Sequence, residues 1–214
     1  MTSKVLKMAG PVDVLDLWFA DSLTNPDNLA ERRVVWFMGG SDVDQLITEK
    51  FGTLPDAALA GELQHWTANT RNALALVLVL DQFPRNIYRN TARAYYYDVA
   101  ALDLAVKIID QGLNLELHPI EQSFLFLPLQ HSEAIDDQTR AVRLYETLTT
   151  QSSGAYLEGT KNSLDYAKRH CDIIRRFGRF PHRNATLGRE STEAEIEFLA
   201  TGGDTFGVVQ PQDA

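Results

Sequence analysis

Cysteine is nearly absent from this sequence. The single Cys171 among 214 residues excludes an internal disulfide, a Cys-rich zinc site and a thiol–disulfide pair, and it suits a reducing compartment. A membrane-length apolar run is also missing, because the longest, residues 73–80, is much shorter than the roughly 20 residues that cross a bilayer. Residues 1–10 contain lysine but no apolar segment, so we expect no signal peptide, a cytoplasmic location and no membrane contact.

Surplus positive charge is absent too. Twenty Lys and Arg stand against 29 Asp and Glu, and the net charge of −9 excludes a chain-wide basic surface and disfavours nucleic acid as a partner. The sequence also lacks a Gly-rich phosphate loop, a nucleophile elbow and a His-Glu-x-x-His zinc motif. No motif therefore names a reaction, and we expect no cofactor.

The sequence does contain a recurring helical pattern. Pro11 suits the first turn of a helix, and Thr192 with Glu195 forms a capping box. Apolar side chains recur at helical spacing between such signals, and strand alternation is nearly missing. We predict an all-α protein of roughly nine helices. It would form one domain, residues 1–204, with a loop at 149–162 and a weakly ordered tail at 205–214.

Three apolar segments are predicted to share one core, because they have too little polar surface to face water. The first is the run 73–80, whose period does not distinguish helix from strand and which we interpret as helix because its neighbours are helical. The second is 124–127. The third is a stripe at helical spacing, made of Tyr166, Ile173, Ile174 and Phe177.

Arginine is concentrated in two parts of this acidic chain. Residues 161–189 hold eight basic side chains and two acidic ones, and a smaller group comprises Arg71, Arg85, Arg89 and Arg93. The planar fork of arginine suits bidentate contacts with carboxylate or phosphate. These arginines either pair with the surplus carboxylates of the chain or form a surface for an anionic ligand.

The two arginine-rich parts share a short pattern. Phe-Pro-Arg-Asn occupies residues 83–86, and Phe-Pro-His-Arg-Asn occupies residues 180–184. Proline disfavours helix at the preceding residue, so each pattern is predicted to end a helix and to present polar side chains there. If both turns line one pocket, the ligand-binding candidates are Arg85, Asn86, Arg89, Arg179, His182, Arg183 and Asn184.

Histidines supply the candidate catalytic groups. His131 and Glu133 follow the apolar residues 124–129, and on a helix their side chains would point about 200° apart. His170 shares the apolar stripe of its helix, which favours a core role. The catalytic candidates are His131, Glu133, His182 and Asp81. A metal site of His131, Glu133, His170 and His182 is chemically feasible but matches no metal motif in its spacing.

Three blocks of sequence are similar to those of a known family. They are Leu-Asp-Gln-Phe-Pro-Arg-Asn-Ile-Tyr-Arg at 80–89, Leu-Pro-Leu-Gln-His-Ser-Glu at 127–133, and Arg-Phe-Gly-Arg-Phe-Pro-His-Arg-Asn at 176–184. In this order they resemble the bacterial family of domain of unknown function 924. The resemblance implies a tetratricopeptide-like helical array, a right-handed α-α superhelix, and it implies no activity.

Two functions remain open at this stage. The first is a helical-repeat-like binding protein whose pocket for an anionic small molecule or acidic peptide forms where residues 81–89, 131–133 and 179–184 meet. The second is a hydrolase-like enzyme, with or without a metal, that uses His131 or His182 as acid or base and Glu133 or Asp81 to orient it.

Overall fold

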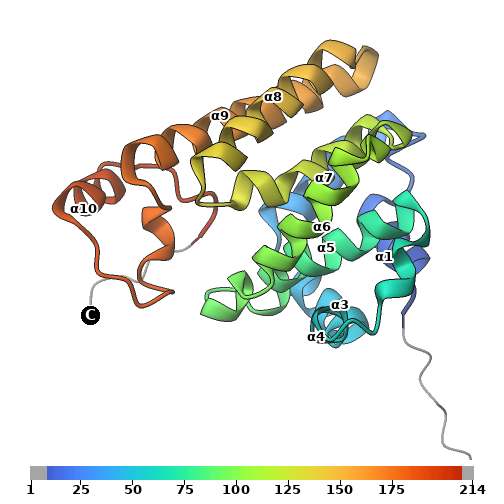
Figure 1. The fold of residues 1–214 in the computed structure, drawn as a ribbon, viewed down its shortest axis with the longest axis horizontal. Helices are drawn as coiled ribbons and strands as arrows, with labels where there is room; N and C mark the ends of the chain where they lie inside the picture. Colours follow the sequence, from blue (N-terminus) through green and yellow to red (C-terminus); the bar gives the residue numbers. More distant parts are fainter. Residues whose placement is uncertain (1–8, 209–214) are drawn as a thin grey trace, which may run out of the picture.

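A computed structural model describes residues 9–208, and every regular element within that range is helical (Figure 1). The all-α prediction is confirmed. The α-helices are α1 (Pro11–Phe19), α2 (Leu29–Arg33), α3 (Ser41–Phe51), α4 (Leu54–Leu59), α5 (Thr70–Ile87), α6 (Asp98–Asp110), α7 (Pro119–His131), α8 (Ile135–Gln151), α9 (Leu157–Phe177) and α10 (Glu193–Ala200). Short 3-10 or π turns join them: η1 (Pro26–Asn28), η2 (Val34–Met38), η3 (Gln64–Ala68), η4 (Ala92–Tyr95), η5 (Leu113–Glu116), η6 (Gly154–Tyr156) and η7 (Pro181–Arg183).

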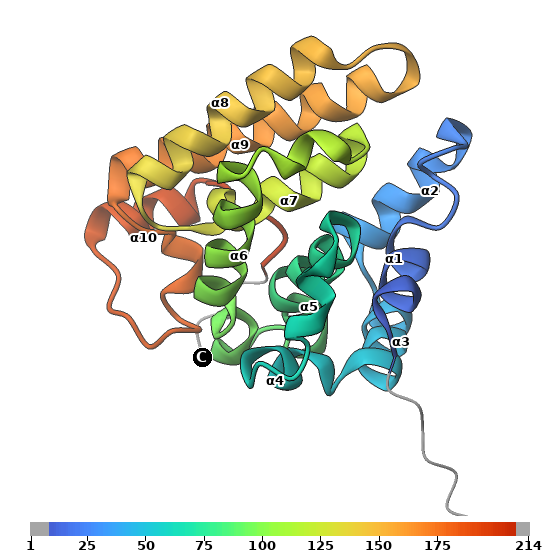
Figure 2. The ribbon, with the colours of Figure 1, turned by 45° about the vertical axis from the view of Figure 1, so that its right-hand side comes forward.

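Helices α5 and α7 form the centre of the array. Residues 73–84 of α5 and 120–130 of α7 are buried all round, as expected of helices with apolar side chains on every face. Helices α1, α3, α4 and α6 pack around α5, while the long pair α8 and α9 lies over α7 (Figures 1 and 2). The apolar run 73–80 is therefore a core helix.

The predicted single core is wrong for its third segment. Residues 73–80 and 124–127 do share the main hydrophobic cluster. Ile173 and Ile174 instead form a separate small cluster with Phe180, bordered by Phe177, and the side chain of Tyr166 is 46% exposed. The C-terminal half of α9 packs its apolar face against Phe180, Phe198 and Phe206 of the C-terminal segment.

The prediction that Phe83-Pro84 ends a helix is also wrong. Helix α5 continues to Ile87, with Pro84 inside it, and the N–H of Tyr88 donates to the Pro84 carbonyl at 2.9 Å. Proline costs a helix one backbone hydrogen bond. Both Phe83 and Pro84 are buried, so tertiary packing outweighs this cost.

The loop predicted at 149–162 is shorter in the structure. Helix α8 runs to Gln151, and α9 begins at Leu157 after the one turn of η6. Gly154 supplies a positive φ of 57° for that turn, which other residues rarely adopt. The hydroxyl of Tyr156 contacts the carbonyl oxygens of Ser22 at 3.2 Å and Leu23 at 3.0 Å. These distant contacts order a segment whose local sequence is polar.

The domain boundary at 204 and the superhelical twist stay predictions. Of the predicted tail, residues 209–214 lie outside the described residues, whereas Phe206 stacks on His170 with ring centroids 3.5 Å apart. No helix in the described range is long and apolar enough to cross a membrane.

Leu78 tests the central position of α5. Its side chain is fully buried, so Leu78→Ala should lower the free energy of unfolding by about 2–5 kcal/mol, measured by urea denaturation. Leu115→Ala is the control, because that side chain is 70% exposed. A loss below ~0.5 kcal/mol for Leu78→Ala would place α5 at the surface.

Candidate functional site

A cavity of about 1220 Å³ lies between the central helices and the C-terminal segment. Residues of η1, α2, η2, α5, η4, α7, α8, η6, α9 and η7 and of the segment 202–208 line it. Of the candidates named from the sequence, the cavity wall includes Arg85, Asn86, Arg89, His131, His170, His182 and Arg183. The two Phe-Pro segments therefore do contribute to one cavity, although only the second follows the end of a helix.

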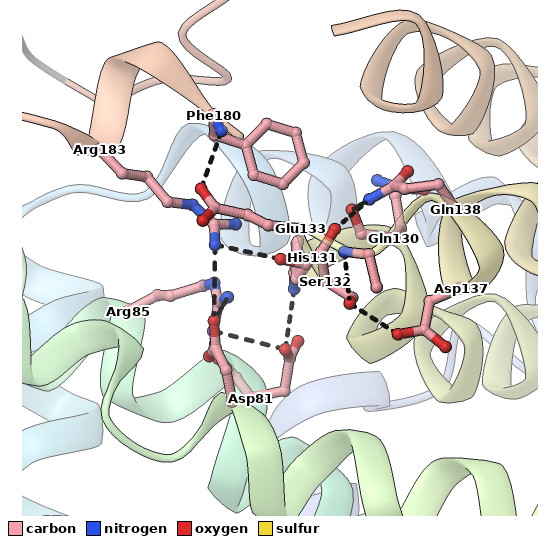
Figure 3. Close-up of polar contacts among 12 residues, drawn as sticks. Asp81, Arg85, Gln130, His131, Ser132, Glu133, Asp137, Gln138, Phe180 and Arg183 are labelled. Atoms are coloured by element: carbon pink, nitrogen blue, oxygen red, sulfur yellow. Dashed lines mark hydrogen bonds and ion pairs between the residues drawn. The ribbon is translucent and has the colours of Figure 1, made fainter. Parts of the chain in front are cut away.

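The carboxylate of Asp81 lies behind this wall and contacts His131 (Figure 3). Asp81 is 1% exposed, and its Oδ1 lies 2.8 Å from His131 Nδ1 while its Oδ2 accepts from Gln82 Nε2 at 2.6 Å. Burial would raise the pKa of Asp81, but the charge of Arg85 and the contact with His131 hold it below its ordinary value. The ionised carboxylate can only accept, so His131 carries its proton on Nδ1 and its lone pair on Nε2.

Helix α7 ends at His131, and side chains fix that end. Gln138 Nε2 donates to the carbonyls of Gln130 and Ser132, each at 2.6 Å, and Arg183 NH1 donates to the carbonyl of His131 at 3.0 Å (Figure 3). The last carbonyls of a helix lack partners inside it, and a cation there is favourable. The position of the His131 ring therefore depends on contacts from α8 and η7.

Two arginines lie beside this pair in different electrostatic states. Arg85 makes a bidentate contact with Asp98, at 2.9 and 3.0 Å, and NH1 lies 3.4 Å from Asp81 Oδ1. Burial would lower the pKa of Arg85, but Asp81 and Asp98 raise it above its ordinary value. Arg85 is thus a fully compensated cation.

Arg183 is compensated much less. It is 6% exposed, its nearest carboxylate is Asp98 at 3.8 Å, and its Nε has no hydrogen-bond partner among residues 9–208. Its guanidinium carbon lies 4.8 Å from the ring centroid of Tyr95 and 4.4 Å from that of Phe180, between two aromatic groups. Burial, which Asp98 offsets only in part, lowers the pKa of Arg183.

The three histidines of the cavity are neutral. Burial and the charge of Arg85 lower the pKa of His131, burial lowers that of His170 well below its ordinary value, and burial with the charge of Arg183 lowers that of His182 to about 3. His131 and His170 have ring centroids 6.2 Å apart.

Three candidates have structural contacts outside the cavity wall. Glu133 accepts the Phe180 N–H at 2.8 Å and binds Arg189 at 2.6 and 3.0 Å. Arg179 binds Glu195 at 2.6 and 2.7 Å, and Asn184 Nδ2 donates to Glu195 at 3.3 Å. These contacts fix the start of η7 and of α10.

Two wall residues have contacts that also occupy their polar groups. Arg89 binds Asp44 at 2.6 and 2.7 Å, and Asn86 donates to the same carboxylate at 2.8 Å. Asn86 therefore ties α5, and Arg89 the turn just after it, to α3 at the edge of the cavity.

The hypothesised metal set is not assembled. Within residues 9–208 no three His, Cys, Asp or Glu side chains are arranged to hold a metal ion. Glu133 lies beyond the end of α7, and its carboxylate contacts Arg189 and the Phe180 N–H.

Sequence reasoning missed three important residues. Asp98 binds Arg85, Tyr95 packs on Arg183, and Phe206 stacks on His170. The aromatic run 95–97 was the available signal for Tyr95, and nothing local distinguishes Asp98 or Phe206.

Comparison with known proteins assigns the family. The model of the family described as "Bacterial protein of unknown function (DUF924)" matches residues 14–203. The chain belongs to this family. Its fold is similar to that of a protein of unknown function, ATU0120, from Agrobacterium tumefaciens, with 35% identity and a TM-score of 0.74 over 90% of this chain and 97% of the other. No curated protein matches. Membership in DUF924 confirms the resemblance and adds no activity.

The neutral histidines predict a pH dependence of stability. His182 binds a proton below its ordinary pKa of 6.5 when unfolded but only near about 3 when folded, so the folded state loses stability as pH falls below 6.5. Urea denaturation between about pH 7.5 and 5.5 should show this loss.

His182→Gln should reduce the change of the unfolding free energy with pH by up to ~1.4 kcal/mol per pH unit, because unfolding then takes up one proton fewer. The control is His65→Gln, an exposed histidine on η3. Equal slopes in the His182→Gln variant and the wild type would show that His182 is already charged in the folded protein.

Proposed function

We propose that this DUF924 protein binds an anionic small molecule in the cavity, with Arg183 as the principal contact. The supporting observation is that Arg183 is a buried cation whose nearest carboxylate, Asp98, is 3.8 Å away and already binds Arg85 at shorter distance. Leaving a buried charge without a close partner is costly. An anion beside Arg183 would supply the missing charge.

The charged residues that line the cavity also favour a negatively charged ligand. Among the described residues it includes five arginines and three carboxylates, in a chain whose net charge is −9. The walls come from elements far apart in the sequence and line a volume of about 1220 Å³, somewhat above the roughly 300–1,000 Å³ of most small-molecule sites. This shape favours a small molecule over an acidic peptide.

Arg183 variants test the proposal. Wild-type protein should show a raised melting temperature with at least one anion from a panel of inorganic phosphate, citrate, benzoate and octanoate, because a ligand of the native state stabilises it. The shift should shrink with added salt.

Arg183→Ala and Arg183→Lys should both lose most of that shift, since Lys lacks the planar fork. The control is Arg175→Ala, which removes a 56% exposed surface side chain paired with Asp172. An unchanged shift in Arg183→Lys and Arg183→Ala would refute the role of Arg183, and no shift with any anion would refute the function.

The Asp81–His131 pair favours a second candidate, a hydrolase. With Nδ1–H held by Asp81 at 2.8 Å, Nε2 is a base at neutral pH. Nε2 would take a proton from water, and the resulting hydroxide oxygen would bond to the carbonyl carbon of an ester. The bond between that carbon and the alkoxy oxygen would then break, and the leaving alkoxide would take the proton from Nε2. His182 is a poor base because its pKa is about 3.

Ester hydrolysis tests this candidate. With p-nitrophenyl acetate, wild type should exceed buffer, and His131→Gln and Asp81→Asn should be slower by about 10²–10⁴-fold. The rate should rise with pH as His131 loses its proton. Because the pKa of His131 is lowered, the rate should reach its plateau at a pH lower than expected for a histidine with the ordinary pKa of 6.5. His65→Gln is the control. An equal rate in His131→Gln would exclude the histidine as the base.

A further inference from the structure

We propose that the ligand is an amphiphilic monocarboxylate, with its anionic group at Arg183 and an apolar body along α7 toward Trp36 and Phe37. This inference rests on the proposed function, because it takes the anion site at Arg183 as given. It adds the class of molecule and the direction in which it lies.

One face of α7 changes character along the cavity. Ile120, Phe124 and Leu127 line the wall at helical spacing, and His131 continues the same face at the end near Arg183. At 1.5 Å per residue, Phe124 and His131 are separated by about 10 Å along the axis. A molecule lying on this face would meet polar groups at one end and apolar groups at the other.

The apolar end is built from three aromatic rings. The ring of Phe124 lies 4.9 Å from Trp36 and 6.1 Å from Phe37, and the Phe37 ring is nearly parallel to it, at 6°. Phe37 is 63% exposed, although it lines the cavity. An apolar ligand body would cover this ring, and such burial is favourable.

The volume points the same way. About 1220 Å³ is far more than a small anion occupies, and acetate at Arg183 would leave the aromatic end in contact with water. A body that reaches about 10 Å from its carboxylate would use both ends of the α7 face.

A second cation, Arg33, lies near the apolar end of the cavity, so a dicarboxylate is the competing class of ligand. Arg33 lines the cavity, and with the Asn162 amide oxygen turned toward it, its NH1 and NH2 donate at 3.2 and 2.9 Å. Arg33 is only half-buried, so water shares the solvation of its charge, and Asn162 accepts two of its N–H groups; we therefore assign one anionic group to the ligand. A dicarboxylate that bridges Arg33 and Arg183 is the alternative to be tested.

Isothermal titration with acetate, butyrate, hexanoate and octanoate tests the proposal on the full chain. The dissociation constant should fall about fourfold for each added methylene, the ratio for burial of one CH₂. Octanol should bind much more weakly than octanoate. Suberate should bind no better than octanoate, because its second carboxylate would lie among the aromatic rings.

Phe37→Ala should make the dissociation constant depend less on the chain length of the carboxylate, while acetate binding stays unchanged. Its matched control is Tyr96→Ala, an aromatic side chain 67% exposed and outside the cavity wall. Both side chains are exposed, so neither variant threatens folding.

The possible failures are distinguishable. Equal affinity for acetate and octanoate, or an unchanged series in Phe37→Ala, would overturn the apolar body and leave the anion site intact. Tighter binding of suberate than of octanoate would overturn the monocarboxylate and favour a dicarboxylate ligand. Octanol binding as tightly as octanoate, or no binding of any carboxylate, would contradict the anion site itself for this ligand class.

Discussion

The buried carboxylate of Asp81 is the contact on which the cavity depends. It joins α5 to α7 through His131, and Arg85 extends the network from Asp81 to Asp98 on α6. The carbonyl of His131 then holds Arg183 of η7. Breaking a buried pair by removing one partner costs about 3–5 kcal/mol. Four segments, α5, α6, α7 and η7, therefore meet in one polar network at the cavity wall.

The ion pairs of the chain distinguish arginines with a structural role from Arg183, the candidate for ligand binding. Most arginines of the two basic stretches pair closely with the surplus carboxylates of the chain: Arg89 with Asp44, Arg93 with Asp56, Arg169 with Asp204, Arg179 with Glu195 and Arg189 with Glu133. Arg183 differs because its guanidinium packs against two aromatic rings, and Asp98, the carboxylate paired with it, lies 3.8 Å away and binds Arg85 more closely. In an acidic protein, a buried arginine left in this state is the feature that most needs a ligand to explain it.

Local signals in the sequence were sufficient for much of the fold. The Thr192–Glu195 capping box starts α10 as expected, and the run 73–80 is a core helix. The errors occur where distant contacts override local preference. Pro84 stays inside a helix because its surroundings are packed, and α9 begins early because Tyr156 binds the backbone near Ser22.

The site was predictable only in part for the same reason. The repeated Phe-Pro pattern and the Gln-His-Ser-Glu block pointed to Arg85, His131 and Arg183, which do line one cavity. The partners that set their charge states, Asp98 and Tyr95, come from another part of the chain; the aromatic run 95–97 marks Tyr95, and Asp98 carries no local signature. Sequence spacing therefore identified the polar groups but not which of them has the weakest charge compensation.

A crystal structure of the protein with octanoate is the most direct test of the anion site. We expect density with the carboxylate at the Arg183 guanidinium, beside His131, and the chain extending along α7 toward Phe124. Density with the carboxylate at Arg33 and the chain end at Arg183, or a cavity that stays empty while octanoate binds elsewhere on the surface, would contradict it.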